Sequence, residues 1–198
     1  REIELDLYNL KNPNQPPYST DFIKQYRIAQ KARILKITTE VDKMLTSLKT
    51  KNNGEVERPF IVHRTMADPR FLDTQLEPNG RKPNSCFLGN PKTVNVGPVG
   101  IARFTTLRAW LSQWSQRSNA DGITCAKRIK TPLLLLENGA DDATPPSHTQ
   151  QIFEASASSD KVMRRIEGAN HYYKDQPKQL KEAVKIVTNW ATDHLNPG

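Results

Sequence analysis

Apolar residues recur at helical spacing through one long stretch of the first half of the chain. From about Thr20 to Leu48 they lie three to five positions apart, and lysines occupy several of the positions between them. This periodicity predicts one long amphipathic helix with a continuous apolar face. The apolar positions of this face are Phe22, Tyr26, Ala29, Ile34, Ile37, Val41, Leu45 and Leu48.

The rest of residues 1–99 carries little regular pattern. The alternation at Ile3–Leu7 is typical of the end of a strand, and residues 58–63 predict a short strand. Nine of the 14 prolines fall in residues 1–99, and residues 68–98 are also rich in Gly and Asn. This composition predicts an ordered but irregular segment.

Residues 100–198 alternate between helical and strand patterns. The stretch from Ile101 to Trp114 predicts a helix, and the apolar run Leu133–Leu136 predicts a strand. Because Pro132 and Gly139 bound this run, we expect a strand over 131–137 that is buried on both faces, as in a parallel sheet. The predicted helix carries Phe104, Leu107, Leu111 and Trp114 on one face.

Three further elements complete this alternation. They are a helix from Ser147 or Thr149 to about Ala157, a strand over 161–166 and a helix over 177–195. The order helix, strand, helix, strand, helix predicts α/β layers around a parallel sheet. Since two strands make no stable sheet of this kind, we expect further strands to come from elsewhere. The buried face expected for the last helix is formed by Leu180, Val184, Val187, Trp190, Ala191 and Leu195.

The composition is that of a polar globular protein. Hydrophobic residues make up 36% and charged residues 25%, and 29 Lys and Arg against 21 Asp and Glu give a net charge of +8. The basic residues are scattered without an aromatic-basic signature, so we expect no nucleic-acid partner. The longest apolar run has four residues, whereas a membrane helix needs roughly 20. No signal-peptide pattern is visible, and we expect a soluble protein without membrane association, its compartment left open.

No residue pattern predicts a metal or cofactor site. Cys86 and Cys125 lie far apart, without the CxxC or Cys–His spacing of zinc sites. One disulfide and two free thiols are both compatible with this spacing. We therefore expect neither a metal ion nor an organic cofactor.

The candidate chemistry lies in the loops that follow the two predicted strands. Asp141 and Asp142 follow the first strand, and His171 follows the second. In α/β sheets such loops form the sites, and an Asp can orient a His and stabilise its imidazolium. Taken alone, an Asp-Asp pair before proline is often a turn or helix cap, and a loop His is often only a polar residue. Their order and their spacing of 29 residues, from Asp142 to His171, favour a catalytic pair.

These residues resemble the C-terminal part of the α/β-hydrolase fold, over about half of the chain. In that family the catalytic acid lies in a Gly-x-x-Asp-x-x-x-Pro loop, which matches Gly139, Asp142 and Pro146. The catalytic His lies in a Gly-x-x-His loop after the last strand, which matches Gly168 and His171. A C-terminal helix follows, as the family requires.

The nucleophile motif of that family is missing from this sequence. The elbow Gly-x-Ser-x-Gly precedes the acid and the His, and no two glycines here lie four positions apart. The resemblance, which runs from about Gly100 to Leu195, implies the C-terminal part of a hydrolase whose N-terminal part is a separate, lost or cleaved polypeptide. It further implies that residues 1–99 form a mainly helical cap and residues 100–198 the C-terminal part of the core.

The resemblance implies acyl transfer from an ester or related bond of a small molecule. His171, oriented by Asp142, would deprotonate a serine of the N-terminal polypeptide and then protonate the leaving group, with Asp141 as the second choice of acid. The oxyanion donors would come from the same partner, so this chain alone would be inactive. Candidates for lining the substrate pocket are Trp110, Trp114, Tyr172, Tyr173 and His63, for each of which core or rim packing is the alternative.

Three alternatives stay open at this point. The same acid and His serve relatives that use another nucleophile or break carbon–carbon bonds. A non-catalytic relative would act as a binding protein, although the retained Asp142 and His171 argue against it. The third alternative is a basic interaction module, which salt-dependent binding to nucleic acid would support.

Overall fold

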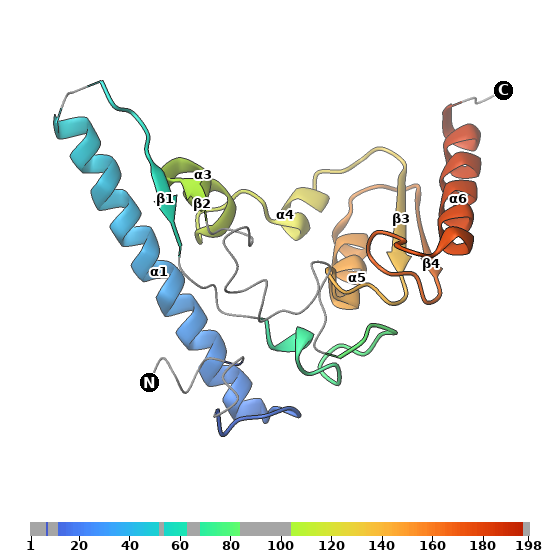
Figure 1. The fold of residues 1–198 in the computed structure, drawn as a ribbon. Helices are drawn as coiled ribbons and strands as arrows, with labels where there is room; N and C mark the ends of the chain where they lie inside the picture. The colour runs from blue at the N-terminus through green and yellow to red at the C-terminus, as the bar shows by residue number, and fades with distance from the viewer. Residues whose placement is uncertain (1–6, 8–11, 52–53, 63–67, 84–103, 196–198) are drawn as a thin grey trace. The chain divides into compact units, whose positions relative to one another are not determined.

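The computed structural model describes residues 7, 12–51, 54–62, 68–83 and 104–195. Contacts divide the chain into two compact units, drawn in Figure 1. This division differs from the expected boundary at residue 99, since each unit takes a segment from both halves of the chain. Unit 1 comprises Arg1–Pro69 and Asn90–Ala120, and unit 2 comprises Arg70–Gly89 and Asp121–Gly198.

The long helix of unit 1 is α1 (Thr20–Lys51), which confirms the predicted amphipathic helix. Its start is capped by Ser19, whose hydroxyl oxygen accepts a hydrogen bond from the backbone N–H of Phe22 at 3.2 Å. The apolar positions face inward as the spacing predicts: Phe22, Tyr26, Val41 and Leu48 are buried. The strand end expected at Ile3–Leu7 lies outside the described residues apart from Leu7.

The second helix of unit 1 is shorter than predicted. The helix expected from Ile101 is wrong in its first part, because α3 (Leu107–Trp114) follows the strand β2 (Phe104–Thr106). This strand pairs antiparallel with β1 (Pro59–Ile61), the short strand that the sequence does predict. Two side chains fix the helix start. Thr106 accepts from the N–H of Ala109, and the Glu57 carboxylate accepts from the N–H groups of the first two helical residues at 3.1 Å.

The core of unit 1 lies between α1 and α3. Trp110 is 2% exposed and meets Phe60 edge-on, with ring centroids 6.4 Å apart. Trp114, at the end of α3, is 39% exposed. The buried members of this core are Val41, Leu48, Val62, Leu107 and Trp110.

Unit 2 carries the predicted α/β alternation. The 3-10 helix η1 (Pro69–Phe71) lies at the boundary of the two units in the sequence. The sequence does not predict α4, which begins after Asp121 because that carboxylate accepts from two backbone N–H groups. The other predicted strands and helices of this half are found within a few residues of their expected bounds. The elements are α4 (Gly122–Ala126), β3 (Leu133–Asn138), α5 (Pro146–Ala155), β4 (Lys161–Ile166) and α6 (Pro177–Leu195).

The two strands of unit 2 pair in parallel, as the sequence predicts. The register runs from Leu133 opposite Lys161 to Asn138 opposite Ile166. Figure 1 shows α5 and α6 on either side of this strand pair. The expectation that the first strand is buried on both faces is wrong, because β3 is only half-buried along its length. Among the described residues β3 pairs with β4 alone, so its other edge has no neighbouring strand there.

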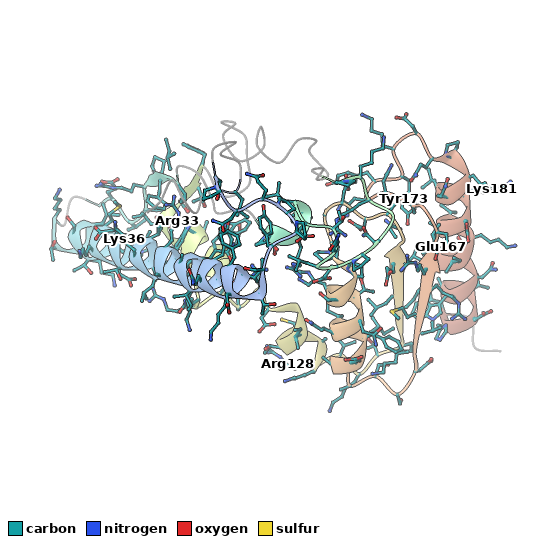
Figure 2. The ribbon with its side chains drawn as sticks, turned by 90° about the horizontal axis from the view of Figure 1, so that it is seen from below. Arg33, Lys36, Arg128, Glu167, Tyr173 and Lys181 are labelled. Atoms are coloured by element: carbon teal, nitrogen blue, oxygen red, sulfur yellow. The ribbon has the colours of Figure 1, made fainter. Side chains whose placement is uncertain are left out.

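The predicted buried face of α6 is largely wrong. Ala183 and Ile186 turn toward the sheet and pack with Ile166 and Ala169. Lys181 points away from the sheet (Figure 2). Nothing in the described part of the chain covers the neighbouring apolar row. This row, here named the α6 stripe, consists of Leu180, Val184, Val187 and Leu195, which are 47%, 56%, 46% and 77% exposed.

Candidate active site

Two loops at the carboxyl ends of β3 and β4 are hydrogen-bonded to each other. The acid loop, residues 139–147, follows β3, and the His loop, residues 168–176, follows β4. The N–H of Gly139 donates to the carbonyl of Ile166, and the N–H of Ala140 donates to the carbonyl of Ala169, both at 2.8 Å. A Cβ at Gly139 would lie 3.0 Å from that Ile166 oxygen. Glycine therefore permits the close approach that brings the two loops together.

The ring of His171 lies against the carboxylate of Asp141. Nδ1 is 3.1 Å from each of the two carboxylate oxygens. The Asp141 side chain is 10% exposed and the His171 side chain 30%. One Asp141 oxygen also accepts from the N–H groups of Ala143 and Thr144, at 2.7 and 2.8 Å. These two N–H groups fix the position of the carboxylate, and both of its oxygens lie next to the imidazole ring.

Asp142, the acid favoured by the sequence, has a different environment. Burial raises the pKa of its carboxyl group, and the neighbouring Asp141 charge adds to this rise. A hydrogen bond from the backbone N–H of Asp142 itself, the charge of His171 and a hydrogen bond from the His171 backbone N–H oppose the shift without cancelling it. The structure thus places Asp141, the second choice, beside the imidazole ring. We refer to Asp141 and His171 below as the dyad.

The His loop is braced by amide side chains that sequence reasoning missed. Asn138, the last residue of β3, accepts from the Tyr173 hydroxyl at 2.6 Å and donates to the carbonyl of Asn170 at 3.1 Å. Gln176 accepts from the N–H of Asn170 at 2.8 Å and donates to the carbonyl of Gly168 at 2.7 Å. No motif marks these residues, because amide side chains at loop ends are common in any sequence.

The tyrosines predicted to line a pocket differ from each other. Tyr172 is 65% exposed, and its ring meets the His171 ring edge-on with centroids 4.6 Å apart. Tyr173 lies in the loop between β4 and α6 (Figure 2) and packs against the core of unit 2. Burial raises the pKa of its hydroxyl group. Only Tyr172 is therefore both exposed and in contact with the dyad.

The other pocket candidates belong to unit 1 or lie outside the described residues. Trp110 fills the core of unit 1, as the packing alternative predicts. Trp114 is partly exposed at the end of α3. His63 lies outside the described residues. Their contribution to a substrate pocket stays a prediction.

A shallow apolar hollow of about 310 Å³ lies beside α6. It includes neither member of the dyad, so it is a separate feature of unit 2. Two of its lining residues belong to the α6 stripe. The hollow is lined by Leu136, Tyr173, Ala183, Val184, Val187 and Thr188.

The start of α5 is held by a carboxylate from a distant segment. Glu77 accepts from the N–H and the hydroxyl of Ser147 at 2.9 and 2.7 Å, and from Arg70 at 2.7 Å. Burial would raise the pKa of Glu77, but the hydrogen bonds from Arg70 and Ser147 outweigh it and hold the pKa below its ordinary value. His148, in the first turn of α5, lies 3.2 Å from the same Arg70 guanidinium. The acid loop thus ends at an anchored helix.

A second His–Asp contact lies at the far end of α6. His194 Nε2 is 3.0 Å from Asp160, and its Nδ1 is 2.7 Å from the carbonyl oxygen of Trp190. The Trp190 carbonyl raises the pKa of His194, and Asp160 adds to the rise. His194 lies on neither loop of the candidate site, so this contact serves below as a control.

The described residues contain neither a metal-binding cluster nor a helix able to span a membrane. No group of three or more His, Cys, Asp or Glu is arranged to hold a metal ion in the described part of the chain. Within the same residues, no helix combines the length and the apolar character that a membrane span requires.

Comparison with known proteins gives one structural likeness. No protein-family model and no curated protein matches the chain. A crystal structure of a monoacylglycerol lipase from Paleococcus ferrophilus is similar at 20% identity, with a TM-score of 0.39 over 83% of this chain. The likeness spans 65% of the length of that lipase. At this TM-score it supports neither a family nor an activity.

Proposed function

We propose that this chain supplies the acid and the base of a serine hydrolase acting on an ester or related acyl bond of a small molecule. The observation that carries the proposal is the dyad, in which Nδ1 of His171 lies 3.1 Å from both oxygens of Asp141. The dyad joins two loops at the carboxyl ends of adjacent parallel strands, where α/β sheets form their sites. Asp141 takes the place of Asp142 as the acid in this proposal.

In this mechanism Asp141 keeps the proton of neutral His171 on Nδ1, so that Nε2 carries the lone pair of the base. Nε2 accepts the proton of a serine hydroxyl as the serine oxygen attacks the substrate carbonyl. The imidazolium, stabilised by Asp141, then gives that proton to the leaving group. Water repeats both proton transfers and releases the acid product.

The serine and the oxyanion donors come, in this proposal, from polypeptide outside these 198 residues. No two of the nine glycines lie four positions apart, so the sequence has no Gly-x-Ser-x-Gly elbow. The partner is the N-terminal polypeptide of the same hydrolase. Residues 1–99 contribute its cap, and Tyr172 beside the dyad lies on the substrate side.

Labelling with a serine-directed fluorophosphonate tests the proposal. The protein is purified with every polypeptide that accompanies this chain, labelled, and its components are weighed under denaturing conditions. We expect one adduct on a serine outside these 198 residues. His171→Ala should slow labelling by about a thousandfold or more, because the serine loses its base. The matched control is His194→Ala, which breaks the other His–Asp contact of unit 2 and should leave the labelling rate unchanged.

Other results separate the alternatives. Labelling that is equally fast in His171→Ala would contradict the proposal. Substrate binding without adduct or turnover would indicate a non-catalytic binding protein. Turnover without a serine adduct would indicate a different nucleophile or the cleavage of a carbon–carbon bond.

A further inference from the structure

A segment from much earlier in the sequence lies against the acid loop. This segment, residues 77–81, is here named the strap. The N–H of Gly80 donates to the carbonyl of Gly139 at 2.8 Å. A Cβ on Gly80 would lie 3.2 Å from the Cβ of Ala140, so the two backbones approach as closely as a glycine allows. The strap is therefore packed directly on the loop that carries the acid of the dyad.

The strap residue that reaches the dyad is Asn79. Its amide nitrogen donates to the backbone carbonyl of Asp141 at 2.9 Å, across 62 positions of sequence. Its amide oxygen accepts from the N–H of Arg81 at 3.1 Å and from the Arg81 guanidinium at 2.6 Å. Because a guanidinium only donates, it fixes the oxygen of the amide on its own side and the NH₂ group on the side of Asp141.

One end of the strap is anchored outside the acid loop. Arg81 is 6% exposed and donates to the carbonyl oxygens of Glu77 at 2.7 Å and Arg70 at 2.6 Å. At its other end, Glu77 binds the first turn of α5 through Ser147. The acid loop is thus held near Asp141 and again at Ser147, by side chains of one short hydrogen-bonded segment in which Arg81 is buried.

We infer that Asn79 is a positioning residue, which holds Asp141 against His171. The inference rests on the proposed function and names a further residue for it. Asn79 touches neither the imidazole nor the carboxylate, and it acts through the backbone of Asp141. Both contacts of Nδ1 are 3.1 Å long, near the upper end of the ordinary hydrogen-bond range. A small displacement of the Asp141 backbone would therefore break them.

The tautomer of His171 provides a test that needs no catalysis. We would record the ring nitrogen signals of ¹⁵N-labelled histidine in the full chain, at a pH where the imidazole is neutral. In the parent chain we expect the Nδ1–H tautomer, because the Asp141 carboxylate faces Nδ1. Asn79→Ala removes the donor, and Asn79→Asp keeps the shape of the side chain but replaces the donor with an acceptor. In both variants we expect the Nε2–H tautomer to become the major form.

Asn189→Ala and Asn189→Asp are the matched controls, since Asn189 is an exposed residue of α6 and should leave the tautomer unchanged. The Nδ1–H tautomer persisting in both Asn79 variants, with the amide spectrum intact, would overturn the inference. So would a parent chain without that tautomer. If Asn79→Ala does not fold, Asn79→Asp still decides the question.

A second readout separates this inference from the proposed function. In the complete hydrolase we expect Asn79→Asp to lower kcat by about tenfold or more with little change in KM, because misplacement of a catalytic group costs rate and not binding. If the Asn79 substitutions change the His171 tautomer but no serine is ever labelled, the proposed function fails and the positioning role stands. If serine labelling requires His171 but neither the His171 tautomer nor kcat changes in the Asn79 variants, the positioning role fails and the proposed function stands.

Discussion

The two adjacent carboxylates Asp141 and Asp142 are the candidates for the acid of the proposed hydrolase, and their surroundings differ. Asp141 faces the imidazole of His171, whereas burial raises the pKa of Asp142. We expect Asp141→Asn to slow fluorophosphonate labelling of the complete hydrolase by about 10⁴-fold, because an amide at this position no longer stabilises the imidazolium. Asp142→Asn is the matched isosteric change one position along the chain. Its labelling rate should stay within about threefold of the parent rate. If Asp142→Asn slows labelling more than Asp141→Asn does, Asp142 is the acid.

The sequence favours Asp142, whereas Asp141 is the carboxylate that lies against the imidazole ring, and the motif spacing explains this difference. The family spacing from acid to proline is met twice, since Asp141 precedes Pro145 as Asp142 precedes Pro146. Only the distance from Gly139 then separates the two candidates. Which carboxylate reaches Nδ1 depends on the backbone path of the acid loop, and no spacing rule encodes that path.

The surroundings of His194 predict a pH dependence of stability that is independent of the candidate site. Its folded pKa is raised above the ordinary value of 6.5, by the Trp190 carbonyl first and Asp160 next. A raised pKa means that the folded state binds the proton more tightly than the unfolded state does. The stabilisation is therefore complete below pH 6.5 and is lost as the pH rises through the folded pKa.

Urea unfolding of the complete hydrolase at several pH values checks this prediction. We expect the parent to be more stable than His194→Gln below pH 6.5, with the difference shrinking as the pH rises. Asp160→Asn should diminish the same pH-dependent difference, since it removes the partner of Nε2. A difference that is constant or grows with pH would contradict the assignment.

At the scale of the elements, local pattern predicts most helices and strands but not their tertiary partners. The spacing in α1 and the run of leucines in β3 are signals within one segment, and both elements are found. β2 is missed because its pairing with β1 joins residues some 45 positions apart, for example Phe60 with Thr105. For the same reason the start of α3 depends on Glu57, a carboxylate from a distant loop.

The junction between β3 and the acid loop gives a stability prediction. A Cβ at Gly139 would meet backbone atoms at the end of β4 and the start of the His loop, at 3.0 Å from the Ile166 oxygen and 3.1 Å from the nitrogen of Gly168. Because backbone at a strand end moves with difficulty, we expect Gly139→Ala to lower the free energy of unfolding by about 1–3 kcal/mol. Denaturant unfolding of the complete hydrolase measures the change.

Gly122→Ala is the matched control for this substitution. There the added Cβ would lie 3.3 Å from the terminal Cδ1 of Ile152, a flexible side-chain end that can shift. The residue also begins α4, where alanine is a better helix former than glycine. We expect Gly122→Ala to change the free energy of unfolding by less than about 1 kcal/mol in either direction. Equal losses in the two variants would show that the close approach at Gly139 is not what stabilises the junction.

At the scale of the whole molecule, the candidate site depends on contacts between residues far apart in the sequence, which sequence patterns do not predict. The order of the acid and His loops is visible in the sequence, and the parallel pairing of their strands follows from it. The strap is not visible, because Asn79 belongs to a segment predicted only as irregular and meets Asp141 across 62 positions. A residue that acts by donating a hydrogen bond to a backbone carbonyl belongs to no sequence motif that would reveal it.

The α6 stripe is a further property of unit 2 that the sequence misjudges. Its spacing is that of a buried face, yet Val184 is 56% exposed, and β3 pairs with β4 alone among the described residues. Exposed apolar rows and open strand edges each promote association. We therefore expect the 198-residue chain, studied alone, to self-associate and to unfold with low cooperativity.

Light scattering and thermal unfolding of Val184→Glu test this expectation. The substitution places a charge in the middle of the α6 stripe and should reduce self-association, because a carboxylate resists burial in an apolar contact. Asn189→Glu adds the same charge to the same helix without removing an apolar side chain, and it should leave association as it is. If the parent chain is already monomeric and melts cooperatively, the stripe is tolerated in water, and the need for a covering polypeptide loses its support. If only Val184→Glu disperses the chain, the stripe is the surface that the N-terminal polypeptide of the proposed hydrolase would have to cover.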